Sequence, residues 1–230
     1  MLAGMMQLTT QLLSINHNND MNKTEIFYHG TCHLFDKFSL SFLGSGESKS
    51  KYGHGIYITS SFKTAARYAS KAAKANSKEC CYVYTVEVPV LVEGKHIYSA
   101  QPVNKDIVDR VEKTIGEPFP DEVKELGKYF RKYLGNLLIG NRRTVKQMLK
   151  SASDEAEDAA AAFLDQIGVV FLVWPRVQRR SSSRHNQGAH DGETNRALLN
   201  ENDIKILKIE QVECDDDNDL IEGSEIEIKL

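Results

Sequence analysis

The chain lacks the features that mark several classes of protein. Its 29 basic and 32 acidic side chains leave a net charge of −3, too small an excess to attract nucleic acid or an anionic membrane. No apolar run in the sequence approaches the ~20 residues that cross a membrane. The first basic residue is Lys23, so the basic segment that opens a secretory signal peptide is missing. We therefore expect no membrane span, no such signal peptide and no nucleic-acid partner.

Cysteine is also scarce, and its spacing predicts no zinc site. The cysteines lack any Cys-x-x-Cys pair and are Cys32, Cys80, Cys81 and Cys214. We expect them to be reduced thiols, as in a cytosolic protein. His29 and His33 lie on a strand-to-loop segment with no evident third ligand, so we predict no metal site. Neither Gly44 nor Gly46 is followed directly by Lys-Ser or Lys-Thr, which excludes a P-loop.

The hydrophobic patterns that are present alternate between strand and helix. β-Branched and aromatic residues predict strands at 24–31, 55–59, 81–88, 169–174, 196–199, 204–212 and 221–230. An alanine-rich helix is predicted at 61–75, and 35–52 is a predicted loop because turn-forming residues dominate it. This mixture predicts the α+β class.

Residues 103–166 have a different pattern, in which leucine, lysine and glutamate recur at helical spacing. We predict a helical insertion of two to four short helices, two of them at 143–150 and 154–167. The chain is thereby divided into a flexible leader (1–22), a core (23–102 and 167–230) and the insertion (103–166). Four apolar side chains of the insertion either dock a partner or pack on the core: Tyr129, Phe130, Tyr133 and Leu134.

Two short segments carry the clearest functional signal. The first is Tyr28-His29-Gly30-Thr31, an apolar strand that breaks at a glycine, where the backbone can approach a bound molecule. The second is Gly53-His54-Gly55-Ile56-Tyr57, followed eleven residues later by Tyr68. Two tyrosines on a strand and a helix can clamp a flat aromatic ring between them. The plainer interpretation is a structural histidine and two core aromatic residues.

These motifs resemble those of the ADP-ribosyltransferases, in the branch similar to poly(ADP-ribose) polymerases. That branch has His-Gly-Thr on its first core strand, then Gly-x-Gly-Ile-Tyr, with a second tyrosine eleven positions after the first. The resemblance covers about residues 26–98 and 167–212. It implies a split β-sandwich of two mostly antiparallel sheets with a cleft for NAD, which would be the co-substrate.

The resemblance also implies roles for individual residues. His29 would hydrogen-bond the adenosine ribose of NAD, and the Gly30 backbone would hold the nicotinamide amide. Tyr57 and Tyr68 would stack on the nicotinamide ring, and Tyr57 would thus belong to the catalytic set as well. Thr31, Ser60 and Asn195 complete the expected cofactor-binding set.

The acidic member of the family's catalytic set has no direct counterpart. The family has a glutamate just before an apolar triplet, and alignment on Ala197-Leu198-Leu199 places Asn195 there. Asparagine cannot supply negative charge to the cation that develops as NAD is cleaved. We predict that Glu193 supplies it and that Asp191 orients or deprotonates the acceptor. Alternatively, Asp191-Gly192 is only a turn and Glu193 only a solvated residue.

The layout is also similar to CteC-like bacterial effectors, which modify host ubiquitin on threonine. This resemblance implies a monomeric enzyme that is secreted into the host cytoplasm, or one that stays in the bacterial cytoplasm. The insertion 103–166 and the loop 176–192 would dock the protein acceptor, with ubiquitin as the suggested acceptor. Three alternatives stay open: a non-catalytic module that binds NAD or ADP-ribose, an NAD glycohydrolase, and a toxin that modifies RNA.

Overall fold

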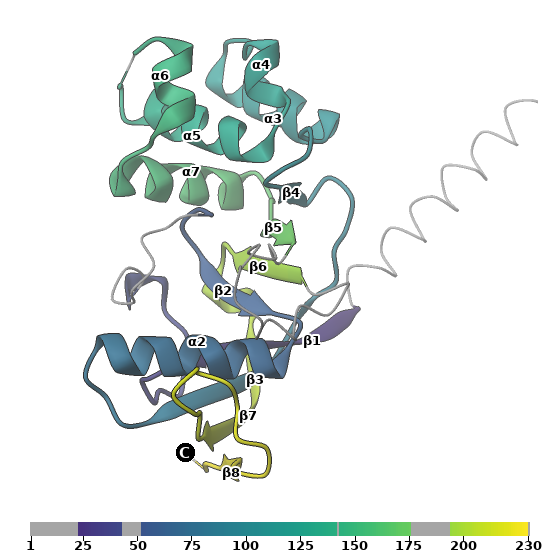
Figure 1. Ribbon diagram of the computed structural model, residues 1–230. Coiled ribbons are helices and arrows are strands. Elements are labelled where there is room, and N and C mark those ends of the chain that lie inside the picture. The colour runs from purple at the N-terminus through teal and green to yellow at the C-terminus, as the bar shows by residue number, and fades with distance from the viewer. Residues whose placement is uncertain (1–22, 43–51, 142, 176–193, 230) are drawn as a thin grey trace, which may run out of the picture.

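One mixed sheet organises the part of the chain that is described. The computed structural model describes residues 23–42, 52–141, 143–175 and 194–229. Its strands are β1 (Thr24–Thr31), β2 (Ile56–Thr59), β3 (Cys81–Pro89), β4 (His96–Tyr98), β5 (Phe171–Pro175), β6 (Thr194–Leu198), β7 (Lys205–Val212) and β8 (Ile226–Glu227). They lie in the order β4-β5-β6-β2-β1-β3-β7-β8 (Figure 1), and only the β4–β5 pairing is parallel. The predicted α+β class is confirmed.

Two groups of helices accompany the sheet. The helices are α2 (Phe62–Ala75), α3 (Lys105–Ile115), α4 (Asp121–Lys124), α5 (Gly127–Leu138), α6 (Val145–Lys150) and α7 (Asp154–Gln166), and two 3₁₀ turns occupy Leu40–Phe42 and Glu201–Asp203. Figure 1 shows α2 across one half of the sheet and α3–α7 beside the other half. Five helices thus fall in the insertion where at most four were predicted. The prediction was too low because α4 and α6 are too short to show a helical periodicity in the sequence.

The sheet consists of two halves that meet at a single residue pair. β1 and β3 are paired along the whole of β1, from Thr24 with Pro89 to Thr31 with Tyr82. In contrast, β1 and β2 share only the pair Tyr28–Thr59. This pair joins β4-β5-β6-β2 to β1-β3-β7-β8 in one eight-stranded sheet, where the resemblance implied two mostly antiparallel sheets.

Helix α2 lies unusually close to β1. Ser61 caps its first turn by accepting a hydrogen bond from the Thr64 N–H (3.3 Å). The buried face of α2 is formed mainly by small side chains, which are Thr64, Ala65, Ala66, Ala69, Ser70 and Ala73. A Cβ added to Gly30 would lie 1.8 Å from the Ala65 carbonyl oxygen. Glycine at position 30 is therefore required by helix packing alone, whatever else its backbone binds.

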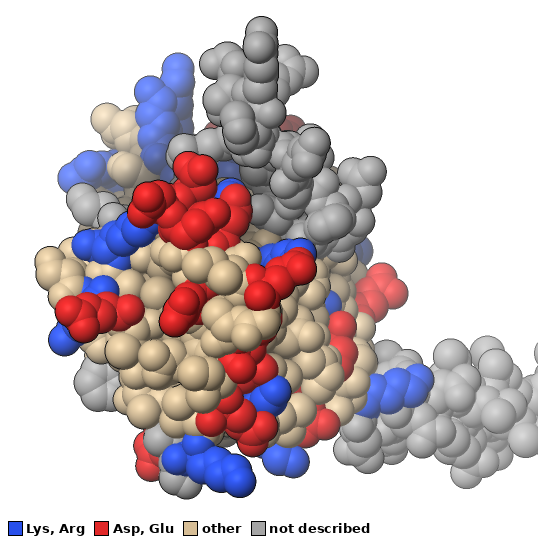
Figure 2. All heavy atoms as spheres, turned by 60° about the horizontal axis from the view of Figure 1, so that its bottom comes forward, with Lys and Arg blue, Asp and Glu red and all other residues tan. Residues whose placement is uncertain are grey.

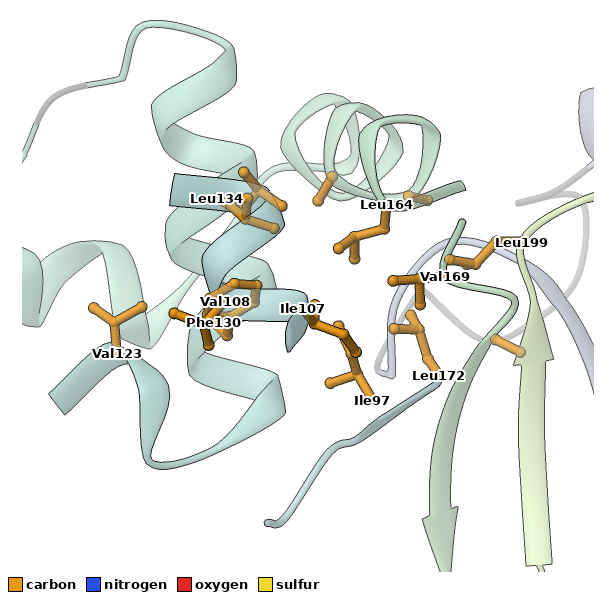
Figure 3. Packing of buried hydrophobic residues seen from close by; sticks show 14 of the residues in the cluster. Ile97, Ile107, Val108, Val123, Phe130, Leu134, Leu164, Val169, Leu172 and Leu199 are labelled. Atoms are coloured by element: carbon orange, nitrogen blue, oxygen red, sulfur yellow. The ribbon is translucent and has the colours of Figure 1, made fainter. Parts of the chain in front are cut away.

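The helices of the insertion pack onto the sheet through their own apolar core. Figure 3 shows Phe130, Leu134 and Leu164 within one cluster that also includes Leu172 of β5. Phe130 and Leu134 are completely buried, so they cannot form an exposed docking face. Tyr133 also packs against this core, with its ring 4.9 Å from the Phe119 ring. The packing interpretation is confirmed for Phe130, Tyr133 and Leu134, and the docking interpretation is wrong for Phe130 and Leu134; Tyr129 is half-buried and is not part of this cluster.

The C-terminal segment folds back onto α2 through charged contacts. Figure 2 shows acidic side chains gathered on the end of the molecule that carries β7 and β8, with basic ones between them. Arg67 of α2 pairs with Asp219, and the Lys63 ammonium lies 2.6 Å from the Glu222 carboxylate. These ion pairs are exposed, so each contributes little alone. The strand predicted at 221–230 is reduced to the two residues of β8.

No helix in the described ranges combines the length and the apolar character that a membrane crossing requires.

The contact between α2 and β1 makes Gly30 sensitive to substitution. Gly30→Ala is expected to lower the free energy of unfolding by about 3 kcal/mol, because α2 must shift to make room for a methyl group. Gly94→Ala is the control, since Gly94 has φ +73° and no atom within 4 Å of an added Cβ. The control should lose only about 1 kcal/mol from backbone strain. Urea denaturation measures both, and equal losses would contradict the packing argument.

Candidate active site

The backbone ladder between β1 and β2 ends beside Gly30. The Ser60 N–H donates to the Thr194 carbonyl (3.0 Å), so the backbone groups of Ser60 point toward β6. Those of Tyr57 and Thr59 consequently point toward β1, because direction alternates along a strand.

The register then brings Gly30 opposite Tyr57. Thr59 pairs with Tyr28, so a continued antiparallel ladder would pair Tyr57 with Gly30. The described ladder stops at the first pair. The Gly30 backbone therefore presents its N–H and C=O toward β2 at the point where strand pairing has ended.

The His29 imidazole, rather than the backbone of β1, forms a hydrogen bond with the Tyr57 carbonyl. Its Nδ1 lies 2.7 Å from that oxygen, and since a carbonyl only accepts, Nδ1 carries the proton. In the neutral ring Nε2 is then an acceptor. The ring lies edge-on to Phe38 at 5.1 Å and to Tyr84 at 6.2 Å. Burial lowers the pKa of His29, and the hydrogen bond to Tyr57 offsets only part of that effect, so the ring is neutral at pH 7.

The hydroxyl of Tyr57 holds the turn that precedes its own strand. It donates to the Gly53 carbonyl (2.7 Å) and accepts from the Tyr52 N–H (3.2 Å). Burial raises the pKa of Tyr57 to about 12, although the Tyr52 N–H and the nearby Arg131 guanidinium oppose the rise. The hydroxyl therefore stays protonated and keeps donating to Gly53. The Tyr57 ring lies 5.1 Å from the Trp174 ring, edge to face.

Two of the predicted residues, Gly30 and Tyr57, lie on the same face of the sheet, where the Tyr57 ring packs against the core of the insertion. Gly30 contacts α2 directly, and Tyr57 lies on the same face because Thr59, two residues on, pairs with Tyr28. Tyr68 lies on α2, one turn after Ala65, and is 48% exposed. The structure thus gathers Gly30, Tyr57 and α2 on one face. The stacking role of the two tyrosines stays a prediction.

Ser60 links the end of β2 to the start of β6 through two hydrogen bonds with Thr194. Besides the bond from its N–H, its Oγ accepts from the Thr194 N–H at 3.0 Å. Asn195 follows in β6, opposite Thr59, and is 4% exposed. The predicted catalytic residues Asp191 and Glu193 lie outside the described residues. Glu193 directly precedes Thr194 in the sequence.

Thr31 has a local role in the structure, and the cysteines form no disulfide. The Thr31 hydroxyl oxygen accepts from the His33 N–H (3.2 Å), which closes the turn after β1. All four cysteines are free. Within the described ranges, no three His, Cys, Asp or Glu side chains gather where they could hold a metal ion.

Two surface cavities are lined by residues other than the predicted ones, although Phe38 of the first contacts the His29 ring. One of about 290 Å³ is lined by residues that include Phe38, Glu201 and Ile206. The other, of about 400 Å³, is lined by residues that include Glu93 and Tyr98 beside β4. Neither contains a residue of the predicted site, so the site is defined by backbone and ring geometry rather than by either cavity.

Charged residues around the Tyr52–Tyr57 turn were missed in the sequence. Arg131 of α5 and Glu157 of α7 form a buried ion pair, and His54 Nε2 lies 3.4 Å from the Asp158 carboxylate. One signal was available, because Arg131 shares a helical face with Leu134, whose spacing marks the buried side.

No protein-family model, no curated protein and no solved structure matches this chain. The likeness to ADP-ribosyltransferases therefore rests on the sequence motifs alone.

Removing the Tyr57 hydroxyl tests its role in the turn. Tyr57→Phe keeps the ring against Trp174 but leaves the Tyr52 N–H and the Gly53 carbonyl without this partner. We expect a loss of about 1–2 kcal/mol in the free energy of unfolding. Tyr129→Phe, on a partly exposed tyrosine, should change it by less than about 0.5 kcal/mol. Matching losses in the two variants would show that the turn does not depend on the hydroxyl.

The neutral state of His29 predicts a pH dependence of stability. The folded pKa lies below the ordinary value of 6.5, so below that value the unfolded chain binds more protons than the folded one. Stability should therefore fall as the pH drops through 6.5 toward the folded pKa, and then level off.

His29→Gln is expected to remove this part of the pH dependence, because a glutamine amide can still donate to the Tyr57 carbonyl without titrating. Chemical denaturation at a series of pH values measures the difference, with His33→Gln, on an exposed histidine, as the control. A pH profile unchanged in His29→Gln would contradict the assignment.

Proposed function

We propose that the chain is a mono-ADP-ribosyltransferase that cleaves NAD at the bond between nicotinamide and ribose and transfers ADP-ribose to a protein acceptor. The observation that carries this proposal is the interrupted ladder at Gly30. A primary carboxamide has an N–H donor and a C=O acceptor side by side, as a neighbouring strand does. The nicotinamide amide can therefore pair with the Gly30 backbone where β2 no longer does.

The neighbouring side chains suit the rest of the NAD molecule. The neutral His29 ring offers Nε2 as an acceptor for a ribose hydroxyl, because Nδ1 is committed to the Tyr57 carbonyl. The rings of Tyr57 and Tyr68 belong to elements on the Gly30 face, where a nicotinamide ring bound to Gly30 would lie. These features support an NAD site in which His29, Gly30, Tyr57 and Tyr68 have the roles that the sequence motifs predict.

The reaction needs negative charge where the ribose becomes positive. Glu193 is proposed to steady that charge and to bind the ribose 2′-hydroxyl, and Asp191 to orient or deprotonate the acceptor. The Ser60–Thr194 bonds support this assignment, since they fix the residue next to Glu193 at the end of β2. In the transfer the bond between ribose C1′ and nicotinamide breaks and nicotinamide leaves with the bonding electrons, while the acceptor oxygen bonds to C1′ and its proton passes to Asp191.

The acceptor is proposed to be a protein, with a threonine of host ubiquitin as the leading candidate. The insertion 103–166 and the loop 176–192 would contact it, and the loop lies outside the described residues. The enzyme would then act as a bacterial effector in the host cytoplasm.

A second candidate function is a module that binds NAD or ADP-ribose without turnover. Asn195 favours it, because its pairing with Thr59 puts it on the face of Tyr57, at the position where the family has its glutamate. An amide there binds hydroxyl groups but supplies no charge.

Incubation with biotin-labelled NAD and a eukaryotic lysate tests the proposal. We expect a labelled protein band that Tyr57→Ala and Glu193→Ala both remove, the latter by a factor of about 10²–10³ in rate. Glu213→Ala, on an exposed acid elsewhere, is the matched control and should label normally. Mass spectrometry of the band identifies the acceptor.

Each alternative has its own outcome in the same experiment. If the protein binds NAD but produces neither a labelled protein nor free nicotinamide, it is a binding module and the proposal of a transferase is wrong. Free ADP-ribose without labelled protein would indicate a glycohydrolase, and label that nuclease removes would indicate RNA as the acceptor. Full activity of Glu193→Ala would move the catalytic role to another residue.

A further inference from the structure

A buried ion pair links two helices of the insertion. The Arg131 guanidinium of α5 contacts the Glu157 carboxylate of α7, and the two side chains are 2% and 6% exposed. Burial lowers the pKa of Arg131 to about 10, so the guanidinium is still charged at neutral pH. Removing two charges from water is costly, and a well-packed apolar pair would often be as stable. The buried charges of Arg131 and Glu157 therefore suggest a role other than packing the two helices together.

Arg131 reaches from the insertion to the turn before β2. A Cβ added to Gly53 would lie 2.9 Å from Arg131 Cδ and 3.0 Å from Nε. The guanidinium stem thus lies directly against the Gly53 backbone, which has φ +112° and is open only to glycine. The same residue accepts the hydrogen bond from the Tyr57 hydroxyl.

Other contacts hold the turn on both sides. On the side of the insertion, His54 Nε2 lies 3.4 Å from Asp158, the residue after Glu157. On the side of the sheet, the Tyr52 ring stacks on Trp174 at 4.4 Å with an angle of 6° between the planes. The turn from Tyr52 to Tyr57 is therefore enclosed between the insertion and β5.

We infer that Arg131, held by Glu157, is a positioning residue that fixes the Tyr52–Tyr57 turn, so that the insertion is part of the site in addition to its proposed contact with the acceptor. Without the arginine side chain the Gly53 backbone loses its contact with Arg131 Cδ and Nε, and the Tyr57 hydroxyl, which donates to the Gly53 carbonyl, loses its fixed place. The turn would then sample several conformations. The consequence for NAD affinity rests on the proposed function, whereas the order of the turn does not.

The test uses variants of the full chain and two independent readouts. Arg131→Met keeps most of the apolar stem, and the double variant Arg131→Met/Glu157→Met also removes the unpaired carboxylate that a single change would bury. Arg110→Met is the control, because Arg110 also lies in the insertion but donates to the Ile167 and Gly94 carbonyls, away from the turn. Circular dichroism is used to find a temperature and a buffer in which every variant is folded.

The first readout is acrylamide quenching of Trp174, the only tryptophan of the chain, and the second is NAD affinity by calorimetry. We expect the double variant to recover stability yet to show increased quenching and about tenfold weaker NAD binding, comparable to one lost hydrogen bond. Arg110→Met should change neither readout at equal fraction folded.

Quenching in the double variant equal to that of the wild type would overturn the inference, because the turn would then be ordered without Arg131. Unchanged NAD affinity alongside increased quenching would overturn the claim that the insertion belongs to the site. If the wild type binds no NAD, the proposed function fails, and the quenching result still decides whether Arg131 orders the turn.

Discussion

The single pair Tyr28–Thr59 is the constraint on which the candidate site depends. One more pair would bring Tyr57 against Gly30 and close the backbone edge with ordinary strand hydrogen bonds. One pair fewer would leave the halves of the sheet without any connection through β1 and β2. The His29 imidazole takes the place of the missing backbone donor at Tyr57, and in doing so it fixes its own tautomer. The interrupted pairing of β1 and β2 thereby leaves unpaired backbone groups at Gly30 beside an oriented His29 imidazole and Tyr57.

Gly30 shows how packing and binding can require the same residue type. The approach of the Ala65 carbonyl excludes any side chain there, so the glycine has a structural reason that is independent of a ligand. The motif His-Gly-Thr is therefore weaker evidence for function than its glycine suggests. The argument for a site lies instead in the direction of the Gly30 backbone groups, which the strand register determines.

Local patterns predicted the elements that build the site, and tertiary contacts decided the rest. The strand 24–31 and the helix 61–75 were predicted well because β-branched and alanine-rich runs dominate them. β4 was missed because three residues carry no readable periodicity. Phe130 and Leu134 were left open between docking and packing, since an apolar stripe looks the same in both cases until its neighbours are known. Arg131 was missed because a charged residue on a helix normally faces solvent, and only its partner Glu157 makes its burial tolerable.

The parallel pairing of β4 with β5 gives the helical segment a topological meaning. Parallel neighbours cannot be joined by a tight turn, because the chain must travel back along the full length of the strand before it enters the next one. The segment between Tyr98 and Phe171 is thus a crossover connection, and its shortest workable form is a dozen or more residues. Relatives of this chain that kept the same strand order would be free to vary the number of helices there, but none could replace the whole segment with a hairpin.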